Sequence, residues 1–104
     1  MRENHILIID DDLMLLKTAE EILSDQYNVS VAKSGIQALN LLNKNIIPDL
    51  ILLDIDMPQM DGFEVLKWMK LSQCIEETPV IMISSEESVD AMRKAYEMGI
   101  TDYI

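Results

Sequence analysis

The sequence predicts a single α/β domain, with a parallel β-sheet covered by helices on both faces. The length of 104 residues suits one domain. Hydrophobic residues make up 49% of the chain, which is enough for a packed core. Short apolar runs alternate with segments of helical periodicity. This alternation is typical of buried parallel strands that are linked by helices.

Five segments are expected to form the strands of this sheet. The first, third and fourth are apolar runs without polar alternation, as in strands covered on both faces, and the second is rich in valine. Pro79 can open its strand, because proline has no N–H to donate to a neighbouring strand. The fifth segment has the character of a strand that is just beginning. The five ranges are residues 5–10, 28–32, 49–54, 79–84 and 101–104.

Four segments between the strands are expected to be helical. Their ranges are residues 12–26, 34–45, 62–72 and 85–99. In the first helix, apolar residues recur at the helical period and predict one broad apolar stripe. This stripe consists of Leu15, Leu16, Ala19, Ile22 and Leu23.

Polar residues and glycines at the helix ends predict caps and turns. Ser34 and Gln37 have the spacing of a capping box at the start of the second helix. Asp61 with Gly62 predicts a turn and a cap before the third helix. Gly99 has the position of a C-terminal cap for the fourth helix.

Acidic side chains and one serine follow three of the predicted strands. Asp10 and Asp11 end the first strand, Asp54 ends the third, and Ser84 ends the fourth. Sites in such sheets form beyond the carboxyl ends of the strands, so these groups meet if the three strands are neighbours. Helix capping is the alternative role for Asp11 or Asp12 at the first helix, and for Ser84 or Ser85 at the fourth. Capping does not account for Asp54, because the segment "IDMPQMDG" intervenes before the next helix.

Several carboxylates that lie together cannot all stay ionised without a compensating charge. Carboxylate oxygens without a His or Cys cluster favour Mg²⁺, which binds through one or two carboxylates, waters and phosphate oxygens. The single histidine, His5, starts a strand and has a packing or surface role. A carboxylate beside Mg²⁺ is suited to attack on phosphorus, and the hydroxyl group of Ser84 can then bind a phosphate oxygen.

The composition excludes several classes of partner and location. The formal net charge of −11 repels nucleic acid and anionic membranes, so we expect no direct contact with either. No apolar run approaches the roughly 18 residues that a membrane helix needs. The N-terminal segment lacks the pattern of a signal peptide, which predicts a cytoplasmic location. Cys74 is the single cysteine, so no internal disulfide can form.

Four motifs, in this order, resemble the receiver domain of two-component response regulators. They are "ILIIDDD", "LLDIDMPQMDG", "PVIMIS" and "AYEMGITDYI", and the resemblance runs along essentially all of residues 1–104. It implies a flavodoxin-like (CheY-like) three-layer fold, with a five-stranded parallel sheet in the order 2-1-3-4-5 and five flanking helices. The resemblance also implies a phosphoacceptor domain in phosphorelay signalling, and not an enzyme that turns over a separate substrate.

The resemblance implies a role for each matching residue at the acidic edge. Asp54 is the phosphoacceptor, which takes a phosphoryl group from a histidine kinase, a phosphotransfer protein or a small donor. Asp10 and Asp11 hold Mg²⁺ together with Asp54, and Asp56 offers its backbone carbonyl to the metal.

Two further residues match the switch of the family. Ser84 corresponds to the hydroxyl residue that turns toward the phosphoryl group. Tyr103 corresponds to the aromatic residue that changes its rotamer at the same time. The face formed by the fourth helix and the fifth strand then changes shape, and partners bind to that face.

The chain also departs from the family pattern. The family carries a lysine just after the fifth strand, and counting on from Tyr103 places this lysine two residues past Ile104. Residues 1–104 therefore resemble a receiver domain that is truncated before the lysine and the last helix. We expect weak phosphorylation of this chain, since the charge-assisted bond from the lysine to phosphate is missing. We also expect self-association through the face that lacks helix five, because bare apolar patches favour association.

Two alternative functions remain open from the sequence. One is a pseudo-receiver, which has the same fold but serves only for docking or dimerisation. The other is a phosphohydrolase of the haloacid dehalogenase type, in which the first aspartate of a DxD motif is the nucleophile. Asp54 and Asp56 have this spacing, but that family requires a threonine where this chain has Pro58.

Overall fold

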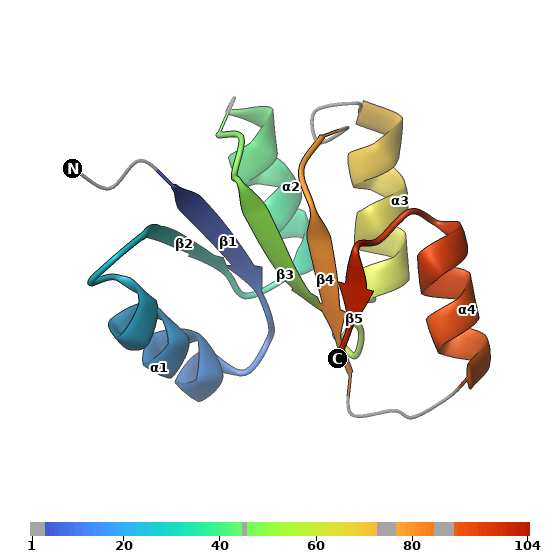
Figure 1. Ribbon diagram of the computed structural model, residues 1–104, viewed down its shortest axis with the longest axis horizontal. Coiled ribbons are helices and arrows are strands. Elements are labelled where there is room, and N and C mark those ends of the chain that lie inside the picture. Colours follow the sequence, from blue (N-terminus) through green and yellow to red (C-terminus); the bar gives the residue numbers. More distant parts are fainter. Residues whose placement is uncertain (1–3, 45, 73–76, 85–88) are drawn as a thin grey trace.

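The computed structural model describes residues 4–44, 46–72, 77–84 and 89–104. Strands and helices alternate along the chain, as the sequence predicts (Figure 1). The elements are β1 (His5–Ile9), α1 (Leu13–Leu23), β2 (Asn28–Ala32), α2 (Gly35–Asn43), β3 (Leu50–Asp54), α3 (Gly62–Ser72), β4 (Val80–Ile83), α4 (Val89–Glu97) and β5 (Asp102–Tyr103).

All five strands pair in parallel, in the order β2-β1-β3-β4-β5. The predicted sheet is therefore confirmed, and β1, β3 and β4 are neighbours. In the register of the sheet, Ile9 pairs with Leu53, and Asp54 pairs with Ile83. The carboxyl ends of the three central strands consequently lie at one edge of the sheet. Asp54 is the last residue of β3, and Asp10 and Ser84 directly follow β1 and β4.

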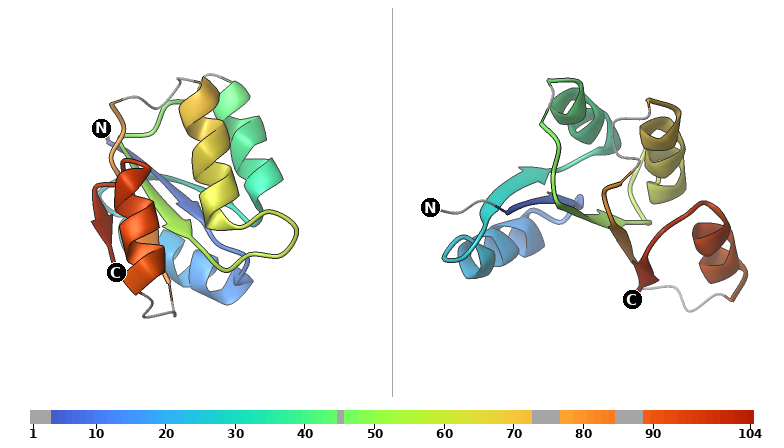
Figure 2. Two further views of the ribbon diagram at one scale, coloured as in Figure 1. Left: turned by 90° about the vertical axis from the view of Figure 1, so that its right-hand side faces the viewer. Right: turned by 45° about the horizontal axis from the view of Figure 1, so that its top comes forward.

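Alternating side chains in the strands divide the apolar residues between the two faces of the sheet. On one face Ile6 and Ile8 pack with Leu16 of α1. On the other face Leu7 and Ile9 belong to a larger core with α2, α3 and α4. Figure 2 shows α1 on one side of the sheet, and α2 and α3 on the opposite side. The sheet is thus the middle of three layers.

The face of the sheet that carries α1 is incompletely covered over β3 and β4. Leu52 pairs with Ile81 in register, and both side chains are half-buried, as is Ile83. A hollow of about 380 Å³ lies on this face of the sheet and is lined in part by Leu50, Leu52 and Tyr27. In the described part of the chain, α1 is the helix that packs on this face.

The first helix differs from its prediction in length and in its buried stripe. α1 ends at Leu23, and residues 24–26 form a turn. Leu16 is 4% exposed, but Leu15 and Ile22 are 42% and 69% exposed and lie outside the packed face. Because α1 contacts the sheet without a second described helix beside it, a narrower stripe is buried than the sequence predicted.

The predicted helix ends agree well with the described structure. The Gln37 N–H donates to Ser34 Oγ at 3.1 Å, as the capping box predicts. Asp61 Oδ1 accepts the N–H of Glu64 at 2.9 Å. Gly99 has a φ of 92°, the left-handed conformation expected of a glycine after a helix.

The fourth helix is described from Val89, and the predicted start at residue 85 lies outside the described residues. The Lys94 ammonium group lies 4.4 Å from the centroid of the Phe63 ring, a cation–π contact that joins α4 to α3. Among the described helices, none has the length and apolar character needed to cross a membrane.

Candidate functional site

Three carboxylates converge at the C-terminal edge of the sheet. One oxygen from each of Asp10, Asp11 and Asp54 can be chosen so that all three lie within 4.8 Å of one another. Asp10 is 7% exposed, Asp54 is half-buried and Asp11 is exposed, so the group opens from the core to the solvent. The sequence-based prediction that these three residues meet is confirmed.

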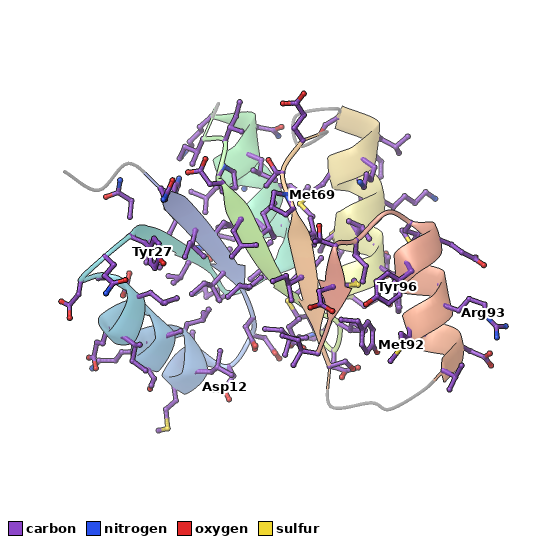
Figure 3. All side chains as sticks on the ribbon, in the orientation of Figure 1. Asp12, Tyr27, Met69, Met92, Arg93 and Tyr96 are labelled. Atoms are coloured by element: carbon purple, nitrogen blue, oxygen red, sulfur yellow. The ribbon has the colours of Figure 1, made fainter. Side chains whose placement is uncertain are left out.

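Asp10 is held by hydrogen bonds on two sides. Its N–H donates to the Ala32 carbonyl at 3.0 Å, which continues the pairing of β1 with β2. Its Oδ1 accepts the N–H of Asp12 at 2.9 Å. Asp12 caps α1, because its Oδ1 accepts the N–H groups of Met14 and Leu15 at 3.0 and 3.2 Å (Figure 3). The cap is therefore Asp12, and Asp10 and Asp11 are left for other roles.

Asp54 is placed by the backbone that leaves β3. The Ile55 N–H donates to the Ile83 carbonyl at 3.1 Å, which continues the pairing with β4. The Asp56 N–H donates to Asp54 Oδ1 at 3.3 Å. Gly62, at the start of α3, donates its N–H to the Ile55 carbonyl at 2.9 Å. A Cβ atom on Gly62 would lie 2.5 Å from the Asp54 carbonyl oxygen, so the loop closes tightly only around glycine.

The Asp54 carboxyl group has a strongly raised pKa. Burial raises the pKa of Asp54 to about 7, and the nearby charge of Asp10 contributes in the same direction. The hydrogen bond from the Asp56 N–H lowers the pKa by a smaller amount. Burial also raises the pKa of Asp10. The hydrogen bonds at the site thus do not compensate for the burial and mutual repulsion of these carboxylates. A bound cation would favour the ionised forms of Asp10 and Asp54.

The donor set of this cluster suits a hard divalent cation. The cluster found among the described residues contains three carboxylates and neither imidazole nor thiolate, which matches the oxygen ligands that Mg²⁺ prefers. Oxygens that bind one Mg²⁺ ion at about 2.0–2.1 Å lie roughly 3–4 Å apart. The three oxygens lie within 4.8 Å of one another, so small rotations of the carboxylates would let them share one ion.

Ser84 follows the strand next to Asp54, and Tyr103 lies one strand further along the sheet. Ser84 follows Ile83, the partner of Asp54, and its N–H donates to the Ile104 carbonyl at 3.1 Å. Tyr103 is half-buried, pairs with Met82 and packs against the larger core. Asp56 is exposed, and its described bond to Asp54 uses its N–H.

Sequence reasoning missed two backbone contributions to the site. The bond from Asp12 to Asp10 orients a carboxylate of the cluster, whereas the sequence indicated only a helix cap for Asp12. The contact of Gly62 with the Asp54 carbonyl was also missed, because an aspartate–glycine pair indicates a turn and not its neighbour in space. Gln59 has a φ of 68°, and nothing in its sequence context indicates this left-handed conformation.

Comparison with known protein families identifies the family of this chain. A family model described as the response regulator receiver domain matches residues 6–104. The chain belongs to this family. The receiver domain therefore accounts for the parallel sheet, its strand order and the acidic cluster at its edge.

Two curated relatives illustrate how this receiver domain is used in longer proteins. The two-component response regulator ORR3 of rice is 35% identical over 103 residues, which cover 98% of this chain and 79% of that protein. The transcriptional regulatory protein CpxR of Escherichia coli is 39% identical over 102 residues. The match covers 97% of this chain but only 42% of CpxR.

Solved structures of similar proteins have the same architecture. The chemotaxis protein CheY4 of Vibrio cholerae has a TM-score of 0.90 and 28% identity, with 97% of this chain and 84% of that chain covered. The response regulator Rcp1, determined in a Mn²⁺-bound form, has a TM-score of 0.85 and 25% identity. In that comparison 97% of this receiver domain and 79% of Rcp1 are covered.

Proposed function

We propose that this receiver domain accepts a phosphoryl group on Asp54 in the cytoplasm, in a reaction that depends on Mg²⁺. The observation that carries the proposal is the convergence of Asp10, Asp11 and Asp54 within 4.8 Å. The Mn²⁺-bound form of the similar protein Rcp1 supports a divalent cation in this fold. The phosphoryl donor is a histidine kinase or a phosphotransfer protein, in keeping with the family.

The chemistry follows from the surroundings of Asp54. An ionised oxygen of Asp54 attacks phosphorus, and an acyl phosphate forms as the bond from phosphorus to the imidazole nitrogen of the donor breaks. The donor imidazole keeps the electron pair of that bond. Only the ionised carboxylate can attack. Because the pKa of Asp54 is raised to about 7, a part of the molecules must first lose the proton of this side chain near neutral pH. Asp10 and Asp11 would hold Mg²⁺, which neutralises charge on the phosphoryl oxygens.

The same proposal gives roles to three neighbouring residues. Ser84 lies one residue beyond the partner of Asp54, so its hydroxyl group is suited to bind a phosphoryl oxygen. Tyr103, on the adjacent strand, would change rotamer when Ser84 moves. The carbonyl group of Asp56 would complete the metal ligands. Residues of α4 and β5 would then present the altered face to a downstream partner, and the net charge of −11 argues against nucleic acid as that partner.

Intact-mass analysis after incubation with Mg²⁺ and a small acyl phosphate tests the proposal. We expect the wild-type chain to gain one phosphoryl group, and we expect Asp54→Asn and Asp11→Ala to prevent the gain. Asp25→Asn serves as the matched control, because Asp25 is an exposed acid outside the cluster. A gain of mass that survives in Asp54→Asn, or no gain in the wild type, contradicts the assignment.

We also propose that the chain self-associates through the incompletely covered face of β3 and β4. Ile81 and Leu52 pair on this face and are half-buried, so association would remove apolar surface from water. In sedimentation equilibrium we expect Ile81→Lys to weaken association. Ile36→Lys places the same charge on an exposed position of α2, which packs on the opposite face, and should leave association unchanged. A wild-type chain that stays monomeric at high concentration rules the proposal out.

A further inference from the structure

A second hollow is lined by residues of α1 and of the edge strand β2, together with Lys33 and Gln37. Both elements lie on the side of the molecule away from β4 (Figure 1). The volume of the hollow is about 290 Å³, which is close to the lower limit of small-molecule sites. Apolar side chains of Leu13, Leu16 and Val31 form part of its lining. Leu16 is 4% exposed and belongs to the core beneath α1, so this part of the hollow rests on a packed layer.

The polar lining of this hollow carries positive charge in a strongly acidic chain. Lys17 and Lys33 both line it, although the whole chain has only 8 Lys and Arg residues and a net charge of −11. Among the described residues, neither ammonium group takes part in a salt bridge. By contrast, the hollow at the start of α1 and the hollow beside β3 contain Asp12 and Asp49 respectively, and neither is lined by a cation.

Gln37 adds an oriented amide group to the same hollow. Its Oε1 accepts the N–H of Lys33 at 2.6 Å, which holds the side chain against the end of β2. Because the carbonyl oxygen of this amide is engaged, its NH₂ group remains available as a donor. Lys33 and Gln37, which both line the hollow, can therefore offer an ammonium group and an amide NH₂ group to a ligand.

The charge of the lining changes along α1. Leu13 opens the helix near the C-terminal edge of the sheet, and Glu20 lies seven residues later, which corresponds to roughly 10 Å along the axis. Glu20 is the one acid in the lining, and it is at the end away from Leu13. An anionic group is therefore favoured beside Lys33 and Gln37, and an apolar group fits beside Leu13 and Leu16.

We propose that this hollow binds a small molecule that carries one carboxylate on an apolar body. The carboxylate would lie between the ammonium groups of Lys17 and Lys33 and the amide of Gln37, and the apolar body would cover Leu16 and Val31. The proposal does not depend on phosphoryl transfer at Asp54, because none of the three clustered aspartates lines this hollow.

Residue-resolved NMR titration of the chain with 3-phenylpropionate, without Mg²⁺, tests this inference. We expect saturable shifts at the amides of Lys17, Val31 and Gln37, with a dissociation constant on the order of millimolar, as for other fragment-sized ligands. The neutral 3-phenylpropanamide should bind at least about fivefold more weakly, because it lacks the charge. Acetate should not saturate the site, because it lacks the apolar body.

Charge variants on the surface make the test specific. Lys17→Gln and Lys33→Gln should each weaken binding by about fivefold, whereas Glu20→Gln should strengthen it by a similar factor. Lys44→Gln is the matched control, since Lys44 is exposed and lies outside the hollow. The proposal is overturned if the shifts do not saturate below about 20 mM, since a fragment that fits a specific site should bind at least this tightly. It is also overturned if the amide binds as well as the carboxylate, or if all four variants have equal affinities.

Discussion

At the scale of single residues, the burial of Asp54, the proposed phosphoacceptor, has a cost in stability. Its pKa of about 7 in the folded chain lies above its ordinary value of 3.8, mainly because of burial. Folding therefore favours the protonated form. The contribution of Asp54 to the free energy of unfolding is therefore most favourable below the pKa of its unfolded state, and it is lost as the pH rises toward 7.

This linkage predicts the effect of Asp54→Asn without metal. We expect the variant to be more stable than the wild type at pH 8 by about 1–2 kcal/mol, a value reduced for solvent screening at this half-exposed site. The difference should shrink toward zero at pH 4. Urea denaturation from pH 4 to pH 8 in the presence of a chelator measures it, and a difference that is independent of pH would contradict the assigned cause.

At the scale of elements, two glycines at helix starts make contacts of different kinds. A Cβ atom on Gly62 would meet the backbone of Asp54 and Ile55 at 2.5 and 2.8 Å. A Cβ atom on Gly35 would meet side chains, with Val65 Cγ2 at 2.6 Å and Met60 Sδ at 2.8 Å. Side chains can rotate away from an added methyl group, whereas the loop after β3 is fixed by hydrogen bonds at Ile55.

We therefore expect Gly62→Ala to lower the free energy of unfolding by at least ~2 kcal/mol and Gly35→Ala by clearly less. Gly62→Ala should also weaken binding of Mg²⁺, because the displaced backbone belongs to Asp54. Denaturation curves and calorimetric titration with Mg²⁺ measure the two effects. Equal destabilisation by both substitutions would show that the loop after β3 yields as easily as a side chain.

At the scale of the whole molecule, the net charge of −11 opposes the compact state. We expect the free energy of unfolding to rise by about 1 kcal/mol between ~0.01 M and ~0.15 M NaCl, because the screening length falls from roughly 30 to 8 Å. The increase should persist in Asp54→Asn, since the repulsion is spread over the surface. Thermal unfolding in a chelating buffer measures this, and no change with salt would show that the surface charges are already balanced locally.

The sequence by itself determined the type and order of the elements along the chain, and it predicted which carboxylates meet at the edge of the sheet. Short apolar runs such as residues 50–53 are typical of strands covered on both faces, and their alternation with helical segments indicated a parallel sheet. The rule that sites form beyond strand ends then predicted that Asp10, Asp11 and Asp54 would meet. Local spacing also predicted the cap at Ser34, because the partners of a cap lie within one helical turn.

Only the tertiary structure decided which apolar positions are buried and how the site is held. Leu15 and Ile22 fit the helical period as well as Leu16 does, but their exposure depends on which neighbours α1 has in space. The pKa of Asp54 and the contact of Gly62 with its carbonyl depend on segments brought together by the sheet. Periodicity describes one element at a time, whereas burial and electrostatics arise between elements that are distant in the sequence.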